Sequence, residues 1–390
     1  MTLFAAILAL VALLGTLLVA PGMARVRRLH PDPKDLDAPS VAVVIAARDE
    51  AETIEPALRS LLGRVGPATQ VVVVDDRSTD GTSEILAGLQ AEHSQLRCVR
   101  VDTLPPGWLG KSHALARGSE AASATDWILF TDADVVFEEG AVEAVVRYAE
   151  ANELDHLTGG PAIRTASFAL GGMIAAFGVL FGLFTQPWRV PLPRTRSAVG
   201  IGALNLVRRR PYVSAGGHEP LRMCIIDDLG LGRMMKAAGG RSEFVYAGDL
   251  IGIEWYPSLA AMMRGLVKNA FAGVDFRLTA VVAATGFISL LLIAPFILPL
   301  LPGVSPPARA MASLAALLLL RAALKAAERS GLPAVTALFF PVGLMLFIVT
   351  LWAIAPTWTY SIEPFPPAPD PSAAPAPLQA ATGRLISSAA

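Results

Sequence analysis

Two aspartates, Asp132 and Asp134, directly follow the apolar stretch Trp127–Phe130, which has the composition of a buried strand. Residues two apart on a strand point to the same face, although a bend at the strand end changes this. Carboxylates suit hard divalent cations such as Mg²⁺ and Mn²⁺, and such a cation can stabilise a nucleotide diphosphate as a leaving group. A solvated turn has the same composition, but the strong strand before it favours a metal site.

A second acidic cluster follows four consecutive valines. Val71–Val74 end at Asp75 and Asp76, and Asp80 comes shortly after, before another helical pattern. Asp80 is expected to cap that helix. Asp76 is then left free to contact the base or ribose of a nucleotide.

A third pair, Asp227 and Asp228, stands at the predicted start of a helix. The pair could simply complement the positive end of the helix dipole. Alternatively, one of the two is a general base, because sugar transfer to a hydroxyl needs a carboxylate within hydrogen-bond reach of that hydroxyl. Neighbouring helical residues point about 100° apart, so only one is expected to face the acceptor.

The segment Gly110-Lys111-Ser112 resembles the end of a P-loop, but Pro105 occupies the place of the first glycine of that motif. A P-loop is therefore excluded. Lys111 can still face a diphosphate as a point charge. No GxGxxG follows a strand, which argues against a dinucleotide-binding fold.

Alternating strand and helix patterns must position these residues. The apolar run Val41–Ala46 precedes a helical pattern at 54–62, and Val71–Val74 precedes another at 85–89. Such alternation predicts an α/β fold with a mostly parallel sheet covered on both faces. Ligands of such sheets bind beyond the carboxyl ends of the strands, which is where the acidic residues stand.

Four motifs in this order resemble those of the family 2 glycosyltransferases with the GT-A fold. Ala46–Glu50 resembles the first motif, with Ala46 for its common Pro and Asp49 for its common Asn. The clusters at 75–80 and 132–134 resemble the second motif and the metal motif. Residues 227–233 resemble the Glu-Asp-x-x-Leu motif, with Asp227 in place of Glu. The resemblance covers roughly residues 38–250.

This resemblance implies a nucleotide-sugar donor, UDP- or GDP-linked, a divalent cation, Mn²⁺ or Mg²⁺, and a set of site residues. Asp228 falls on the catalytic base, and Asp132 and Asp134 on the metal ligands. The donor side comprises Ala46, Arg48, Glu50, Asp76, Lys111 and Asp132, and the acceptor side comprises Asp227, Gly216, Gly217 and His218.

The segment 105–112 and the paired aspartates resemble hopene-associated and carotenoid-type membrane glycosyltransferases. Processive polysaccharide synthases have a Gln-x-x-Arg-Trp motif after the acid, and this sequence has none. An inverting single transfer to a membrane lipid is therefore expected. A processive synthase remains an alternative, and a non-catalytic membrane scaffold with this fold is an alternative of another class.

Composition agrees with a membrane protein, since 53% of the 390 residues are hydrophobic and 17% are charged. Net charge −1 gives no sign of a nucleic-acid partner, and two cysteines without CxxC spacing give no zinc site. An anchor at 1–24 is expected, then a cytoplasmic catalytic domain at 38–275, about three membrane helices at 279–356 and a disordered tail at 361–390. Arginines are favoured on the cytoplasmic side of a membrane, so those after the first helix predict a catalytic domain in the cytoplasm. The N-terminus is then expected on the outer side of the cell (inner) membrane.

The apolar segment 167–185 lies inside the catalytic region. Its length would allow it to span a membrane, but a span there would put Asp134 and Asp228 on opposite sides. A helix that lies in or dips into the cytoplasmic leaflet is expected, and a buried core helix is the alternative. Arg189, Arg194 and Arg196 follow it and could hold lipid headgroups.

Overall fold

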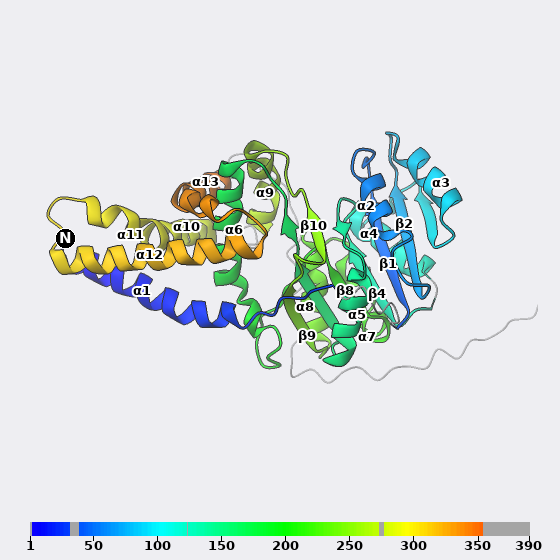
Figure 1. Ribbon diagram of the computed structural model, residues 1–390, viewed down its shortest axis with the longest axis horizontal. Coiled ribbons are helices and arrows are strands. Elements are labelled where there is room, and N and C mark those ends of the chain that lie inside the picture. The colour runs from blue at the N-terminus through cyan, green and yellow to red at the C-terminus, as the bar shows by residue number, and fades with distance from the viewer. Residues whose placement is uncertain (1, 32–38, 123, 273–276, 354–390) are drawn as a thin grey trace, which may run out of the picture.

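The computed structural model describes residues 2–31, 39–122, 124–272 and 277–353. The predicted tail at 361–390 lies outside these residues. An α/β domain lies at one end of the molecule and an elongated bundle of apolar helices at the other (Figure 1).

A seven-stranded sheet organises the α/β domain, in the order β3-β2-β1-β4-β8-β6-β9. β8 runs antiparallel to β4 and β6, and the other neighbours are parallel, so the predicted mostly parallel sheet is confirmed. The strands predicted at 41–46, 71–74 and 127–130 are β1, β2 and β4. The bounds are β1 Val41–Ala47, β2 Thr69–Asp76, β3 Leu96–Val101, β4 Trp127–Thr131, β6 His156–Gly160, β8 Asn205–Arg208 and β9 Ser242–Tyr246.

Helices cover both faces of this sheet, and the side chains of β1 alternate between two cores. Val43 and Ile45 pack with Leu58 in one core, whereas Val44 packs with Leu115 in the other. Burial on both faces explains the uninterrupted apolar strands of the sequence. The covering helices are α2 Ile54–Leu61, α3 Thr82–Glu92, α4 Gly110–Ala121, α5 Ala141–Ala151, α7 Arg209–Ser214 and α8 Asp227–Ala237, with a short 3₁₀ turn, η2, at Glu219–Leu221.

A small three-stranded sheet, in the order β5-β10-β7, lies between the main sheet and the helical bundle (Figure 1). Its strands are β5 Val136–Phe137, β7 Ala162–Ile163 and β10 Ile251–Ile253. The amide of Ile163 donates to the carbonyl oxygen of Ser330, at the end of a bundle helix, over 2.7 Å. This sheet therefore joins the two parts of the molecule.

Apolar helices make up the bundle. Within the described residues, four helical stretches are long and apolar enough to cross a membrane: 168–189, 278–300, 306–329 and 334–352. The apolar N-terminal helix α1 lies beside them. The bounds are α1 Thr2–Ala24, α6 Phe168–Thr185, η1 Pro187–Arg189, α9 Leu259–Ala272, α10 Leu278–Phe287, η3 Ile288–Ile293, α11 Ala294–Ile297, η4 Leu298–Leu300, α12 Pro306–Arg329, η5 Ala334–Phe339 and α13 Phe340–Trp352.

α1 and α12 lie side by side, and the C-terminal ends of both reach the α/β domain (Figure 1). Arg329, the last residue of α12, donates to the carbonyl oxygen of Met23 over 3.0 Å, and its guanidinium lies over the ring of Tyr246 in β9. Just after α1, Arg28 forms an ion pair with Asp249. The starts of both helices therefore lie at the end of the bundle that is remote from the domain.

α6 runs across the direction of α1 and α12 where the bundle meets the domain (Figure 1). Its glycines admit neighbouring helical segments: a Cβ at Gly172 would lie 2.3 Å from the Cβ of Phe339. More than half of the apolar segment that begins with α6 is buried inside the protein. This arrangement is compatible with the helix in the cytoplasmic leaflet that the sequence led us to expect.

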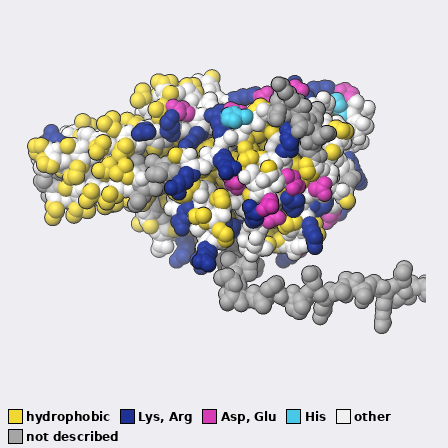
Figure 2. Space-filling view, turned by 60° about the horizontal axis from the view of Figure 1, so that its bottom comes forward, with side chains coloured by type: hydrophobic (Ala, Val, Ile, Leu, Met, Phe, Trp, Pro, Cys, Tyr) yellow, Lys and Arg dark blue, Asp and Glu magenta, His cyan; other side chains and the backbone are white. Residues whose placement is uncertain are grey.

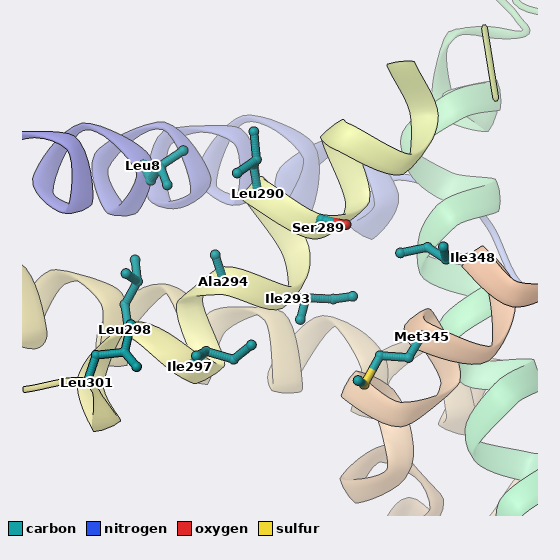
Figure 3. Close-up of a pocket in the computed structure, with 10 residues that line it drawn as sticks. All are labelled: Leu8, Ser289, Leu290, Ile293, Ala294, Ile297, Leu298, Leu301, Met345 and Ile348. Carbon is teal, nitrogen blue, oxygen red and sulfur yellow. The ribbon is translucent and has the colours of Figure 1, made fainter. Parts of the chain in front are cut away.

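An apolar groove of about 540 Å³ follows the outer part of the bundle (Figure 3). It lies between α1, α13 and the segment from α10 to α11. The π-helical segment η3, which connects α10 to α11, contributes to its wall. Its lining is apolar except for Ser289, and comprises Leu8, Ser289, Leu290, Ile293, Ala294, Ile297, Leu298, Leu301, Met345 and Ile348.

Candidate functional site

Charged side chains from three separate sequence motifs meet in one cavity. Lys111 comes from the first turn of α4, Asp132 from the end of β4, and Asp227 and Asp228 from the first turn of α8. His218 and Asn205 also line this cavity. The cavity lies at the carboxyl end of β4, where a ligand is expected in such a sheet.

Lys111 lies between carboxylates of two different elements. Its Nζ is 2.7 Å from Asp132 Oδ1 and 3.6 Å from Asp227 Oδ2. Burial alone would lower the pKa of Lys111, but the carboxylates of Asp132, Asp227 and Asp228 outweigh this effect and raise that pKa above its usual range. Lys111 is therefore a permanent cation that can face a diphosphate.

Asp134 lies two residues after Asp132, beyond the end of β4. Burial and the charge of Asp132 raise the pKa of the Asp134 carboxyl to about 6. Two carboxylates in this situation are stabilised by a divalent cation, so the residues fit the metal that the sequence implies. Among the described residues, no group of three or more acidic, histidine or cysteine side chains could hold a metal. One or two carboxylates together with substrate phosphates are, however, a usual Mg²⁺ site.

Asp228 is anchored through both of its carboxylate oxygens. Oδ2 accepts from the amide of Gly202 over 2.9 Å, and Oδ1 accepts from the amide of Leu229 over 2.7 Å. Burial and the neighbouring Asp227 raise the pKa of Asp228 to about 7. A carboxyl group with this pKa can take up a proton near neutral pH.

Asp227 and Asp228 both line the cavity, and the expectation that only one of them faces the acceptor stays a prediction. Asp227 faces Lys111, whereas Asp228 faces the loop that contains Gly202.

The loop 199–204 is a part of the site that the sequence did not reveal. A Cβ at Gly200 would lie 1.7 Å from the carbonyl oxygen of Asp228, and one at Gly202 would lie 2.3 Å from Asp132 Oδ2. Only glycine allows the backbone to approach both aspartates so closely. The Gly-x-Gly spacing before a strand was the one available signal.

Asp76 is not free, contrary to the expectation from the sequence. Its carboxylate accepts two hydrogen bonds from the guanidinium of Arg77, at 2.8 and 3.0 Å, and its side chain is almost fully buried. Arg77 has φ 60°, a left-handed conformation that turns it back onto its neighbour. A Cβ at Gly110 would lie 2.5 Å from Asp76 Oδ2, which places this ion pair beside the start of α4.

Asp80 performs the predicted capping in a modified form. Helix α3 begins at Thr82 with Gly81 at its N-cap, and Asp80 Oδ1 accepts from the amide of Thr82 over 3.0 Å. Asp80 Oδ2 also accepts from the amide of Ala51 over 3.0 Å. The loops after β1 and β2 are thereby tied together.

The first motif begins at the end of β1 and continues into the loop that follows it. The amide of Glu50 donates to Thr82 Oγ1, and the charge of Glu50 contributes to the raised pKa of Asp134. Arg48 is exposed beside Asp49, and Ala46 is paired with Val74 inside the sheet. Glu50 is thus the member of this motif whose charge bears on Asp134.

The residues expected on the acceptor side, Gly216, Gly217 and His218, differ in their roles: one lines the cavity, and the two glycines shape the backbone before it. His218 is buried in the cavity wall, its Nδ1 lies 2.5 Å from the hydroxyl of Tyr212, and burial lowers its pKa to about 3, so it is neutral. Gly216 and Gly217 have φ values of 97° and 62° and form the turn before it. The two glycines therefore have a conformational role that places His218.

Comparison with known proteins places part of this chain in a known family. Residues 42–208 match the family described as Glycosyl transferase family 2. The chain is 30% identical over 199 residues to a 4,4'-diaponeurosporenoate glycosyltransferase of Staphylococcus aureus, a match covering half of each protein. It is 29% identical over 132 residues to a poly-beta-1,6-N-acetyl-D-glucosamine synthase of Staphylococcus epidermidis, covering 34% of this chain and 31% of that protein. The chain thus spans half the length of the first relative and about a third of the second.

The fold resembles that of a mannosyltransferase from Pyrobaculum calidifontis, PcManGT, solved with GDP-Man and Mn²⁺. The TM-score is 0.50 at 18% identity, and the match covers 90% of this chain and 99% of that one. Residues 42–208 therefore form a domain that matches the family 2 glycosyltransferases, within a GT-A fold that is joined to apolar helices long enough to span a membrane.

Proposed function

We propose that the protein is an inverting glycosyltransferase that moves a sugar from a UDP- or GDP-sugar to a hydroxyl group of a membrane lipid. The observation that carries this proposal is the convergence of Lys111, Asp132, Asp227 and Asp228 in one cavity. A cation for a diphosphate and a carboxylate of raised pKa for a hydroxyl are the two groups that such a transfer needs.

On the donor side, Lys111 faces the diphosphate with its permanent charge. A divalent cation held by Asp132 and Asp134 would supply further positive charge that stabilises the departing nucleotide diphosphate. The solved relative with GDP-Man and Mn²⁺ supports this class of donor and cation. The Asp76–Arg77 pair at the start of α4 would contact the nucleoside.

On the acceptor side, Asp228 takes the proton of the attacking hydroxyl. The oxygen then attacks the anomeric carbon from the face opposite the diphosphate, which inverts the configuration. The amide of Gly202 keeps one carboxylate oxygen in place during this step. Asp228 therefore carries the bond-forming half of the reaction.

The helical bundle supports a lipid acceptor and a cytoplasmic site. Lys and Arg side chains gather where the apolar bundle meets the domain (Figure 2). Exposed arginines follow α1 at Arg25, Arg27 and Arg28, and others follow α6 at Arg189, Arg194 and Arg196. Such a band favours the cytoplasmic face of the membrane and anionic headgroups. A lipid hydroxyl at this face would be close to the catalytic domain.

A processive polysaccharide synthase is the competing enzyme, because such synthases are among the relatives. The test is nucleotide release from a panel of UDP- and GDP-sugars, UDP-glucose and GDP-mannose included, by the full-length protein in membranes, with and without added lipid extract. Release that depends on lipid and yields one-sugar products supports the proposal, whereas long polymer supports the synthase. No release with any UDP- or GDP-sugar would favour a non-catalytic scaffold.

A further inference from the structure

A buried polar face of β6 is connected to Asp228 by hydrogen bonds. His156 and Thr158 are two residues apart on this strand and share a face, and both are fully buried. Leu157 between them packs into the apolar core on the other face. Buried polar side chains are nearly always hydrogen-bonded, and a fully bonded network makes the surrounding structure rigid.

One line of hydrogen bonds runs from His156 to the main chain of Asp228. His156 Nε2 lies 2.7 Å from Asn205 Oδ1, and Asn205 Nδ2 donates to the carbonyl oxygen of Asp228 over 3.1 Å. Because the amide oxygen of Asn205 can only accept, the proton of the neutral imidazole must be on Nε2. Burial, which lowers the pKa of His156 to about 4, keeps the imidazole in this neutral form.

A second line runs from Thr158 to the carboxylate of Asp228. The hydroxyl of Thr158 donates to the carbonyl oxygen of Leu204 over 2.8 Å and accepts from the amide of Ile201 over 2.9 Å. The next amide, that of Gly202, donates to Asp228 Oδ2. Thr158 therefore fixes both sides of the short loop that holds the carboxylate.

We infer that His156, Asn205 and Thr158 are positioning residues that aim the Asp228 carboxylate at the acceptor hydroxyl from two sides. The inference rests on the proposed function, in which Asp228 is the base. A displacement of about 1 Å at a reacting group can slow an enzyme by up to a hundredfold. Loss of either line should therefore lower kcat far more than donor affinity, since no hydrogen bond of these lines reaches Lys111, Asp132 or Asp134, although the loop 199–204 lies against Asp132.

Two matched pairs of variants test the inference in the full-length protein. His156→Gln keeps a donor near the place of Nε2, whereas His156→Leu removes it. Thr158→Ser keeps the hydroxyl, whereas Thr158→Val removes it with little change of shape. Leu157→Ala is the control, because it weakens the core at the same strand without touching either line.

The measured quantities are lipid-dependent nucleotide release from UDP-glucose or GDP-mannose, whichever wild type uses, and affinity for that donor. We expect His156→Leu and Thr158→Val to lower kcat by about tenfold or more with donor affinity within about threefold of wild type. His156→Gln, Thr158→Ser and Leu157→Ala should keep most of the activity of the folded protein. Equal kcat within both matched pairs would overturn the inference, and so would loss of kcat in Leu157→Ala as large as in Thr158→Val.

A double variant that combines Thr158→Val with Asp228→Asn distinguishes a positioning role of Thr158 from a general loss of activity through a damaged fold. If the two lines act through Asp228, Thr158→Val should slow Asp228→Asn much less than it slows wild type. Full additivity would contradict the inference even if kcat falls. If Asp228→Asn alone transfers sugar at the wild-type rate, the assignment of the base in the proposed function fails, which is a different result.

Discussion

Lys111 Nζ lies 2.7 Å from Asp132 Oδ1, so a lysine at the start of α4 is paired with the aspartate at the end of β4. The same ammonium group is 3.6 Å from Asp227 of α8. Three elements that are distant in sequence are thus connected by one cation. In the proposed reaction the diphosphate of the donor takes over part of this ion pairing.

The first prediction concerns this lysine. Lys111→Met should weaken donor binding by at least about tenfold, because a hydrogen bond to a charged group contributes about 1.5–3 kcal/mol. The measurement is donor affinity by titration calorimetry. Arg117→Met, on the same helix and exposed beside Glu120, is the matched control and should bind the donor normally. Equal affinities for the two variants would contradict the role of Lys111.

The second prediction concerns the metal. Activity should require Mn²⁺ or Mg²⁺, and Asp134→Ala should abolish it while the protein remains folded, because the charge of the leaving diphosphate is then poorly neutralised. Nucleotide release with and without excess chelator measures the requirement. Asp102→Ala removes an exposed carboxylate elsewhere and should be harmless. Full turnover in chelator would eliminate the metal site.

The third prediction concerns the base. Asp228→Asn should bind the nucleotide-sugar nearly normally but transfer the sugar at least about a hundredfold more slowly, the low end for acid–base catalysis. Asp227→Asn should have a milder effect, because Asp227 faces Lys111. Single-turnover rates and donor affinities of both variants decide between them. An inactive Asp227→Asn beside an active Asp228→Asn would show that the two roles are exchanged.

The fourth prediction concerns pH. The pKa of Asp228 is raised to about 7 by burial and by Asp227. A base acts in its deprotonated form, so kcat/KM should be nearly constant above about pH 8 and fall tenfold per pH unit well below pH 7. A pH–rate profile of the wild type measures this. A profile that stays flat down to pH 5 would exclude Asp228 as the base.

The fifth prediction concerns topology. A cysteine at Pro302, at the end of the bundle remote from the domain, should be labelled from outside the cell, and one at Ser94 should not. The native thiols give little background, because burial raises the pKa values of Cys98 and Cys224 to about 11. The reverse labelling pattern would overturn the cytoplasmic placement of the catalytic domain.

The sequence predicted those parts of the site that follow long apolar strands. Runs such as Val71–Val74 and Trp127–Phe130 identify β2 and β4, and the acidic residues after them must then lie at one edge of the sheet. Because parallel strands all run in the same direction, the position of Asp75 and Asp132 at this edge could be predicted. Lys111 was found because its motif could be compared with a known phosphate-binding pattern.

The remaining parts lacked such a pattern. Asn205 and Thr158 lie on β8 and β6, and the antiparallel direction of β8 cannot be inferred from alternation of strands and helices. Pairing of Asp76 with Arg77 depends on a left-handed backbone conformation at Arg77. For α6, hydropathy is the same whether the helix spans a membrane, lies in one leaflet or packs in a core, so composition could not distinguish them.

In the proposed function, the site transfers one sugar to a membrane lipid. The most direct measurement is mass spectrometry of lipids from cells that produce the wild-type chain, the Asp228→Asn variant or neither. A lipid that is heavier by the mass of one sugar residue is expected in wild-type cells only. An identical lipid profile in the three kinds of cells, together with sugar polymer in the wild type, would contradict it.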